Sequence, residues 1–333
     1  MDEIMKNENQ AENLQPEEPT SIVQQKHLEL KNELSKIIIG QSDMIDLLFV
    51  GLICNGHILI EGVPGIAKTL SAKMMAKAIG ANFNRVQFTP DLMPSDLLGT
   101  SIFNTKSSEF QFREGPIFSN IVLIDEINRA PAKTQAALFE VMEEKQISFD
   151  GKTYKLEFPF FILATQNPIE QEGTYKLPEA QLDRFLFRIL LDYPTMQEEE
   201  QILHRFKNDF SQFLQEDISQ VITKEDLRSC MEIVEDIEIK DELLRYIAEL
   251  VHQTRHTPDL YLGASPRASL AILKSAKAMA SIQGRNFVTP DDIRKVTYPV
   301  LNHRIILSAD REMEGVSSAE VIESIIKNVE VPR

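Results

Sequence analysis

Residues 58–71 read ILIEGVPGIAKTLS, and this stretch decides the fold. Three branched apolar residues at its start predict a buried strand, and the spacing of apolar residues after Lys68 and Thr69 predicts a helix. A loop with two glycines and a proline joins them. This is the strand–loop–helix context in which G-x-x-x-x-G-K-[ST] binds phosphate through backbone N–H groups at a helix N-terminus.

The match to the phosphate-binding pattern has one departure, since Ala67 stands where the second glycine is expected. Alanine keeps the backbone N–H groups, so the Lys68 amine can still reach the β- and γ-phosphates and the Thr69 hydroxyl can bind Mg²⁺. The alternative is a glycine-rich turn that binds nothing. The residues predicted to contact the nucleotide here are Gly62, Val63, Pro64, Gly65, Ile66, Ala67, Lys68, Thr69 and Leu70.

Composition and charge narrow the class of protein. A length of 333 residues favours two domains, and 43% hydrophobic with 26% charged residues is enough to build proper cores. The net charge of −16 argues against a surface broadly adapted to nucleic acid or anionic membrane, although a local basic channel in an oligomer would be compatible with it.

The cellular compartment is also constrained by the sequence. The N-terminus shows no secretory signal, and the most apolar stretch, residues 47–60, is interrupted and too short to span a bilayer. Cys54 and Cys230 lie far apart in apolar surroundings, which predicts buried free thiols of a reducing compartment. We therefore expect a soluble, cytoplasmic protein without membrane insertion.

Strands that alternate with helices predict a doubly wound α/β domain. Helices are expected over residues 21–38, 42–54 and 132–145, and strands over 58–60, 83–88, 121–124, 160–164 and 185–191. Residues 89–116 look like an irregular insertion, and Asp150 and Gly151 predict a hairpin turn.

Beyond Pro194 only helices are expected, three of them opened by capping boxes at Thr195, Thr289 and Ser317. The predicted division is a flexible acidic tail (1–20), an α/β nucleotide-binding core (21–194) and a helical lid (195–333).

Polar residues follow two of the predicted buried strands. Asp125 and Glu126 end one strand, and Asn167 follows the next. Because ligands bind beyond the carboxyl ends of parallel strands, these side chains are candidates for phosphoryl-transfer chemistry. Asp125 would bind Mg²⁺ through water, Glu126 would act as general base, and Asn167 would hold the attacking water. The alternatives are a solvated strand end and a plain Asn-Pro turn.

The sequence resembles the AAA+ ATPases and, within them, the MoxR family, over residues 35–333. The segments that carry the resemblance are residues 61–69 (EGVPGIAKT), 87–99 (QFTPDLMPSDLLG), 115–118 (GPIF), 125–131 (DEINRAP), 164–168 (ATQNP), 170–175 (EQEGTY), 177–185 (LPEAQLDRF) and 263–267 (GASPR). Ala67 is usual in this family, and Lys176, where proline is usual, is a small departure. The resemblance implies a P-loop NTPase core with a parallel five-stranded sheet and an all-α lid.

The resemblance also implies roles that spacing alone does not show. Arg184 matches the arginine finger that enters the ATP site of the neighbouring subunit; the alternatives are an ion pair with Asp183 or Glu179, and Arg188 as the finger. Arg267 matches the sensor-2 arginine, which contacts the γ-phosphate of its own subunit; the alternative is a plain helix-start arginine.

Further segments are placed by the same resemblance. Ile39 and Gly40 match the lining of the adenine pocket, and residues 89–116 match the helix-2 insert. The hairpin around Asp150 and Gly151 matches the pre-sensor-1 hairpin. In this family both inserts face the ring pore.

The function expected from the resemblance is ATP hydrolysis with Mg²⁺ in a homo-oligomeric, hexameric ring that remodels or matures a protein client. A von Willebrand factor A domain protein is the expected partner. Two rival hypotheses are a nucleic-acid motor, which the acidic charge and the lack of an appended DNA-binding module disfavour, and a nucleotide switch with negligible turnover.

Overall fold

The computed structural model describes residues 21–62, 68–106, 108–167, 175, 177–207 and 218–332. The predicted tail, residues 1–20, and the loop residues Val63, Pro64, Gly65, Ile66 and Ala67 lie outside the described residues.

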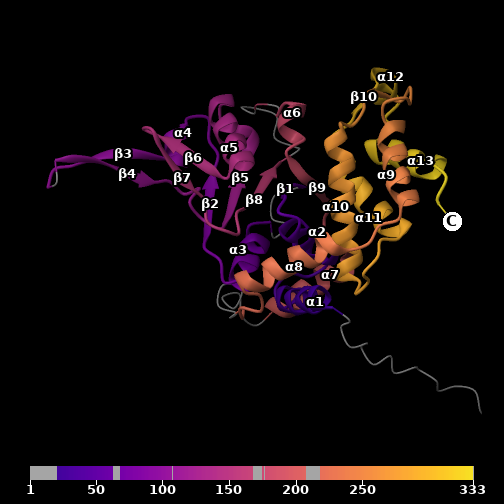
Figure 1. Cartoon of the computed structure of the whole chain (residues 1–333), viewed down its shortest axis with the longest axis horizontal. Helices are drawn as coiled ribbons and strands as arrows, with labels where there is room; N and C mark the ends of the chain where they lie inside the picture. The colour runs from indigo at the N-terminus through magenta and orange to yellow at the C-terminus, as the bar shows by residue number, and fades with distance from the viewer. Residues whose placement is uncertain are drawn as a thin grey trace, which may run out of the picture.

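A five-stranded parallel sheet forms the centre of the molecule, as the sequence predicts (Figure 1). The strands are β1 (His57–Gly62), β2 (Phe83–Gln87), β5 (Ile121–Asp125), β8 (Phe161–Gln166) and β9 (Phe185–Leu191), and their order is β2-β5-β8-β1-β9. Their near-continuous apolar sequences follow from burial on both faces. In β1, for example, Ile58 and Ile60 pack in one hydrophobic cluster while Leu59 packs in the other.

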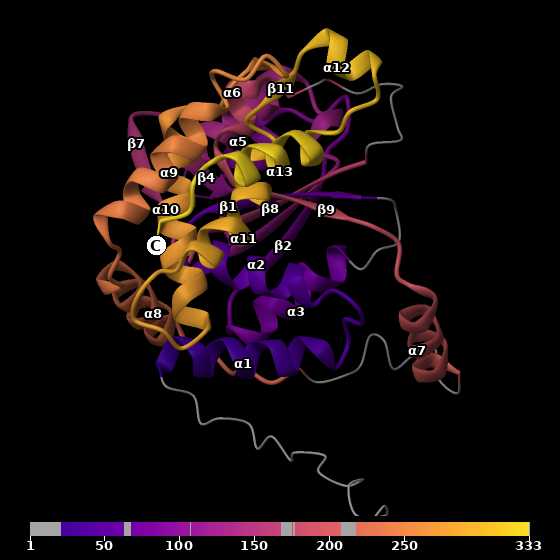
Figure 2. The ribbon, with the colours of Figure 1, turned by 90° about the vertical axis from the view of Figure 1, so that its right-hand side faces the viewer.

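Helices cover both faces of this sheet. On one side lie α1 (Ile22–Ser35), α2 (Ser42–Ile53) and α3 (Lys68–Ala78), and on the other lies α5 (Ala132–Glu144) (Figure 2). Each predicted helix in the core is therefore confirmed, with bounds a few residues shorter than expected. None of the helices in the described part of the chain combines the length and apolar character that a membrane crossing requires.

The C-terminal part consists mainly of α8 (Lys224–Asp236), α9 (Asp241–Gln253), α10 (Pro266–Ile282), α11 (Pro290–Leu301) and α13 (Ser318–Asn328). These helices share one continuous apolar cluster with α1, α2 and α3. The predicted capping boxes of α7 (Met196–Phe206), α11 and α13 are all present, and Thr223 with Asp226 forms a further one on α8. The division into core and lid at residue 194 stays a prediction.

The expectation of helices alone after Pro194 is wrong in one place. A small antiparallel pair, β10 (Leu260–Leu262) with β11 (Ile306–Leu307), leads into the short helix α12 (Ala309–Met313). Strands of three and two residues are too short to show alternation in the sequence.

Residues 89–116 are more regular than expected. They contain α4 (Pro94–Leu98) and an antiparallel hairpin of β3 (Gly99–Asn104) and β4 (Glu109–Glu114), which projects from the body (Figure 1). The hairpin escaped prediction because both of its faces are largely exposed, so no apolar side alternates with a polar one.

The second hairpin, β6 (Gln146–Phe149) with β7 (Lys152–Lys155), turns at Asp150 and Gly151 as predicted. The ring of Phe112 on β4 lies 4.9 Å from that of Phe149 and 4.5 Å from that of Tyr154. The two inserts therefore pack against each other at the base of the projecting hairpin.

Candidate nucleotide-binding and hydrolysis site

The two ends of the phosphate-loop sequence meet at the carboxyl edge of the sheet. Lys68 opens α3, and its Nζ donates a hydrogen bond to the carbonyl oxygen of Gly62, the last residue of β1, at 2.8 Å. A Cβ at Gly62 would lie 2.7 Å from the backbone oxygen of Leu191, so β9 leaves room only for glycine. Thr69 and Leu70 follow in the first turn of α3, both half-buried.

Lys68 lies in the field of the predicted acidic residues. Partial burial lowers the pKa of the Lys68 amine, and the negative charges of Asp125, Glu126 and Glu61 act to raise it again. The amine and these carboxylates are therefore close enough to interact, as a site for a metal–triphosphate complex requires.

Asp125 is buried at the end of β5 and held on both carboxylate oxygens. Thr165 of β8 donates its hydroxyl to Oδ1 at 3.1 Å, and Arg85 of β2 donates Nε to Oδ2 at 2.5 Å. The parallel register that pairs Ile124 with Ala164 brings Thr165 level with Asp125. A buried carboxylate beside the Thr69 end of α3 fits the oxygen ligands that Mg²⁺ prefers.

Glu126 turns away from the strand in a left-handed conformation with a φ of 56°. Its backbone N–H donates to the Thr165 hydroxyl at 3.0 Å, and its carboxylate accepts from Gln87 Nε2 at 2.7 Å and pairs with Arg129 at 3.1 Å. Thr165 therefore contacts both acidic residues. A left-handed residue other than glycine is costly, which points to a functional constraint on this position.

Asn167 lies at the same edge of the sheet. It directly follows β8, the strand between β5 and β1, and the register that pairs Gln166 with Glu61 places it level with Gly62. The sequence predictions for Lys68, Asp125, Glu126 and Asn167 are therefore met in one respect: the structure brings all four to one edge. Their chemical roles stay predictions.

Arg184 lies at the opposite edge, directly before β9, whose Phe185 pairs with His57 at the start of β1. The six residues of β1 at about 3.3 Å each separate that edge from Gly62 by about 20 Å. Arg184 forms an ion pair with Glu143 of α5. The alternative partners considered from sequence, Asp183 and Glu179, are not the ones that the structure gives it.

Arg267, in the first turn of α10, joins Arg184. Its Nη2 lies 3.2 Å from Oε1 of Glu143, the carboxylate that also binds Arg184. In this conformation α10 begins at the edge remote from Lys68, so Arg267 lies away from the phosphate loop of its own subunit. Its role at the γ-phosphate stays a prediction. Proximity to Arg267 adds to the lowering of the Arg184 pKa that burial causes.

Arg188, the alternative candidate for the arginine finger, binds two residues of its own chain. Its Nε and Nη2 lie 2.9 and 2.7 Å from Glu61 Oε2, and its Nη1 donates to the Asn302 carbonyl.

Ile39 and Gly40, which are predicted to line the adenine pocket, follow α1. Gly40 has a φ of 76°, and the carboxyl group of Glu198 on α7 lies against it. Figure 2 shows α7 standing off from the body of the molecule.

Comparison with known proteins agrees with this geometry. The family described as "ATPase family associated with various cellular activities (AAA)" matches residues 57–187, from the start of β1 into β9, and the AAA lid domain family matches residues 252–325. Chaperone MoxR1 of Mycobacterium tuberculosis is 42% identical over 310 residues, which cover 90% of this chain and 81% of that protein. This chain belongs to the MoxR family of AAA+ ATPases.

Other relatives extend the MoxR-family likeness along the chain. The protein YeaC of Bacillus subtilis is 44% identical over 299 residues, which cover 90% of this chain and 92% of that protein. A solved structure from Cytophaga hutchinsonii has a TM-score of 0.86 at 42% identity and covers 95% of this chain and 97% of its own. The α/β core with a helical lid is thus the fold of this MoxR-family chain.

The sequence did not predict four residues that contact the candidate site residues: Thr165, Arg85, Gln87 and Glu143. Arg85 and Gln87 occupy alternate positions of β2, so they share one face of that strand, and this alternation is the one signal that the sequence offers. Thr165 and Glu143 act through register and helix packing, which no local pattern reveals.

The remaining chemical candidates are structural. Cys54 and Cys230 are buried free thiols, as expected, and burial raises their pKa values to about 12 and about 11. The rings of His252 and His256 stack at 4.0 Å. The described residues contain no group of three or more potential metal ligands among His, Cys, Asp and Glu.

Proposed function

We propose that this chain hydrolyses ATP with Mg²⁺ at the interfaces of a ring of identical subunits, and that turnover drives chaperone-like remodelling of a protein client. The observation that carries the proposal is the separation of charges: Lys68 with two acidic residues at one edge of the sheet, and two arginines at the other. A site divided in this way is complete only between neighbours in a head-to-tail ring.

The residues at the carboxyl edge supply binding and base chemistry. Lys68 neutralises the β- and γ-phosphates, and Glu126 accepts a proton from the water that attacks the γ-phosphorus while the bond to the bridging oxygen breaks. Asn167 orients that water. The Thr69 hydroxyl and, through water, Asp125 would hold Mg²⁺, which would supply positive charge to the phosphate oxygens.

The residues at the amino edge complete the neighbour's site. Arg184 is the finger, because Arg188 is bound to Glu61 beside its own phosphate loop. Arg267, which shares Glu143 with Arg184, joins it as a second positive charge. Glu143 holds both side chains in the single subunit, and phosphate replaces it when the ring assembles.

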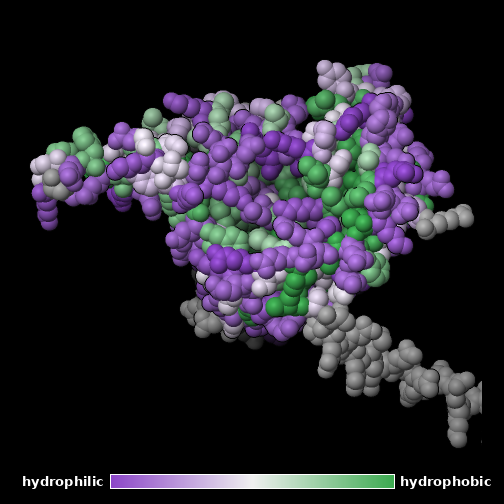
Figure 3. Space-filling view, in the orientation of Figure 1, coloured by the Kyte–Doolittle hydropathy of each residue, from purple (hydrophilic) through white to green (hydrophobic). Residues whose placement is uncertain are grey.

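The client-binding surface is proposed at the projecting hairpin. Phe103 and Phe110 are 49% and 71% exposed near its tip, where Figure 3 shows hydrophobic residues on an otherwise polar arm. Exposed aromatic side chains bind unfolded protein segments without sequence preference. The chaperone name of MoxR1 supports this role, and a von Willebrand factor A domain protein is the proposed partner.

The test is the variant Glu126→Gln, which removes the base but keeps size and polarity. We expect ATP affinity within about twofold of the parent and turnover reduced at least about 10²-fold, measured by fluorescent nucleotide binding and steady-state phosphate release. Glu249→Gln, on the exposed face of α9, is the matched control and should keep full turnover. Undiminished hydrolysis by Glu126→Gln contradicts the assignment of the base, and a parent protein with no measurable turnover supports a nucleotide switch instead.

A further inference from the structure

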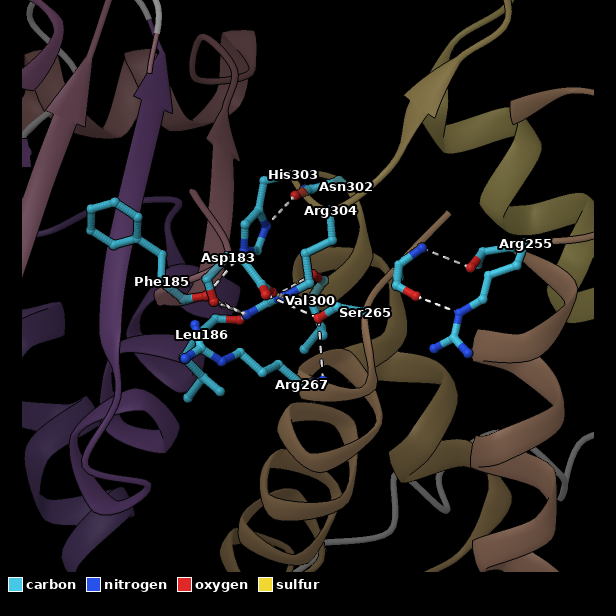
Figure 4. Close-up of polar contacts among 12 residues, drawn as sticks. Asp183, Phe185, Leu186, Arg255, Ser265, Arg267, Val300, Asn302, His303 and Arg304 are labelled. Atoms are coloured by element: carbon cyan, nitrogen blue, oxygen red, sulfur yellow. Dashed lines mark hydrogen bonds and ion pairs between the residues drawn. The ribbon is translucent and has the colours of Figure 1, made fainter. Parts of the chain in front are cut away.

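A buried arginine of the lid, Arg304, surrounds the proposed finger with hydrogen bonds. Its side chain is 3% exposed, and all five N–H donors of its guanidinium group are used. Three donors bind the backbone carbonyls of Asp183, Phe185 and Leu186, one binds the carbonyl of Val300, and Nε binds Asp183 Oδ1 at 2.7 Å (Figure 4). The carbonyls thus held come from both sides of Arg184.

The same aspartate ties the finger to the start of α10. Asp183 Oδ2 accepts a hydrogen bond from the Ser265 hydroxyl at 2.9 Å, and Ser265 in turn accepts the backbone N–H of Arg267 at 3.2 Å (Figure 4). Arg184 and Arg267 therefore stand on two elements that Asp183 and Arg304 join. A substitution at Asp183 or Arg304 can therefore change the distance between Arg184 and Arg267 without altering either arginine.

The contacts extend along β9. Asn302, directly after α11, donates its amide to the Arg188 carbonyl at 3.0 Å, and His303 Nε2 lies 3.1 Å from the Phe185 carbonyl oxygen. Three successive residues of the lid thus fix the segment 183–188. A guanidinium group is expensive to bury unless its donors are satisfied. Here each donor of Arg304 binds either the finger segment or the carbonyl of Val300 in the preceding helix, α11.

We propose that Arg304, through Asp183, is a positioning residue that holds Arg184 and Arg267 as one unit facing the neighbouring subunit's ATP. This inference rests on the proposed function, since it concerns the geometry of the finger. Lysine cannot substitute, because its three donors radiate from a single nitrogen and cannot span carbonyls on both sides of Arg184.

The test compares Arg304→Lys with Arg285→Lys. Arg285 also pairs with an aspartate, since its Nη2 and Nη1 lie 2.6 and 2.8 Å from the two carboxylate oxygens of Asp292, but this pair lies inside the lid and remote from the finger. We expect Arg304→Lys to lower kcat about 10²-fold with the ATP KM nearly unchanged, because a displaced finger loses transition-state contacts alone. Arg285→Lys should keep kcat.

Two further measurements separate positioning from general stability. Added to Arg184→Ala, Arg304→Lys should cost less turnover than it costs the parent, because part of its effect acts through the residue already removed. Mixed with Glu126→Gln subunits, Arg304→Lys subunits should regain turnover, because their own base meets the partner's intact finger; a random equal mixture completes about a quarter of the interfaces. Should Arg304→Lys fail to fold, Asp183→Asn carries the same predictions.

The outcomes discriminate between the two proposals. The role of Arg304 is overturned, with the trans finger intact, if the mixture of Arg184→Ala with Glu126→Gln recovers turnover but Arg304→Lys fails one of its own tests. Those failures are an unchanged kcat, a full additive loss when Arg304→Lys is added to Arg184→Ala, or no gain when Arg304→Lys is mixed with Glu126→Gln. If the Arg184→Ala mixture also fails to recover, or Arg184→Ala alone keeps full turnover, the trans finger itself is wrong and the positioning role falls with it.

Discussion

At the residue scale, one hydroxyl group holds both acidic residues of the proposed site. Thr165 donates to the Asp125 carboxylate and accepts the backbone N–H of Glu126, so it fixes the carboxylate proposed to bind metal and the turn that carries the proposed base. A hydroxyl group fits this position because it can donate and accept at the same time.

Thr165→Val, which keeps the shape but removes the hydroxyl, should lower kcat about tenfold with nucleotide affinity retained. The Asp125 carboxylate and the Glu126 N–H would each lose a buried partner, at about 1–3 kcal/mol. Thr297→Val is the control, since Thr297 is equally buried and its hydroxyl donates to a carbonyl within α11. Phosphate release and thermal unfolding check both variants; an equal loss of kcat in the two would contradict the role of Thr165.

The buried ring of His57 should make the stability of the fold depend on pH. Burial lowers its pKa to about 4, while Nδ1 accepts the N–H of Ile162 and Nε2 donates to the Met142 carbonyl. In the unfolded chain His57 therefore binds a proton below about pH 6.5, whereas in the folded chain it binds one only below about pH 4. Stability is full above pH 6.5 and falls as the pH drops, by about 3 kcal/mol from this group.

Urea unfolding between pH 7.5 and 5 measures that dependence. His57→Gln preserves a donor and an acceptor but does not titrate, so its slope with pH should be shallower than that of the parent. The residual slope belongs to His303, whose pKa burial also lowers. A parental slope in His57→Gln would contradict the assignment.

At the scale of elements, the sequence predicts those helices, strands and turns whose residues form a clear local pattern. The five strands, the helices that flank them and the Asp150–Gly151 hairpin follow from apolar runs, caps and turn residues. The β3–β4 hairpin and the β10–β11 pair could not be predicted, because exposed or very short strands lack a one-sided apolar pattern. Arg304 was missed for a related reason: a lone arginine after a helix shows no sign of its partners on β9.

The hairpin should bind client through its tip and not through its base. Phe103→Ser combined with Phe110→Ser should leave basal hydrolysis unchanged and weaken binding of fluorescently labelled β-casein about tenfold, from the loss of exposed apolar area. Phe112→Ser tests the base, where Phe112 packs on Phe149 and Tyr154; it should lower thermal stability but leave the affinity for casein unchanged. Fluorescence anisotropy supplies the measurement, and unaltered casein affinity in the tip variant contradicts the proposed surface.

At the scale of the whole molecule, the sheet separates two half-sites. Lys68, Asp125, Glu126 and Asn167 could be predicted from motifs that end strands, and the structure brings them to one edge. The position of Arg267 could not be predicted from the sequence, because it depends on how the lid packs on β9. In the structure Arg267 lies at the edge of the sheet remote from Lys68, beside Arg184. If these two groups are the half-sites that we propose, a single chain should not hydrolyse ATP efficiently alone.

Turnover should therefore depend on assembly. Mixing Arg184→Ala subunits, which keep Lys68 and Glu126, with Glu126→Gln subunits, which keep the finger, tests this dependence most directly. Neither variant alone should release phosphate above about 1% of the parent rate, since a finger supplies about 10³-fold or more. We predict that the equal mixture recovers turnover well above both. A mixture that releases phosphate no faster than the average of its two components would contradict the shared interface site.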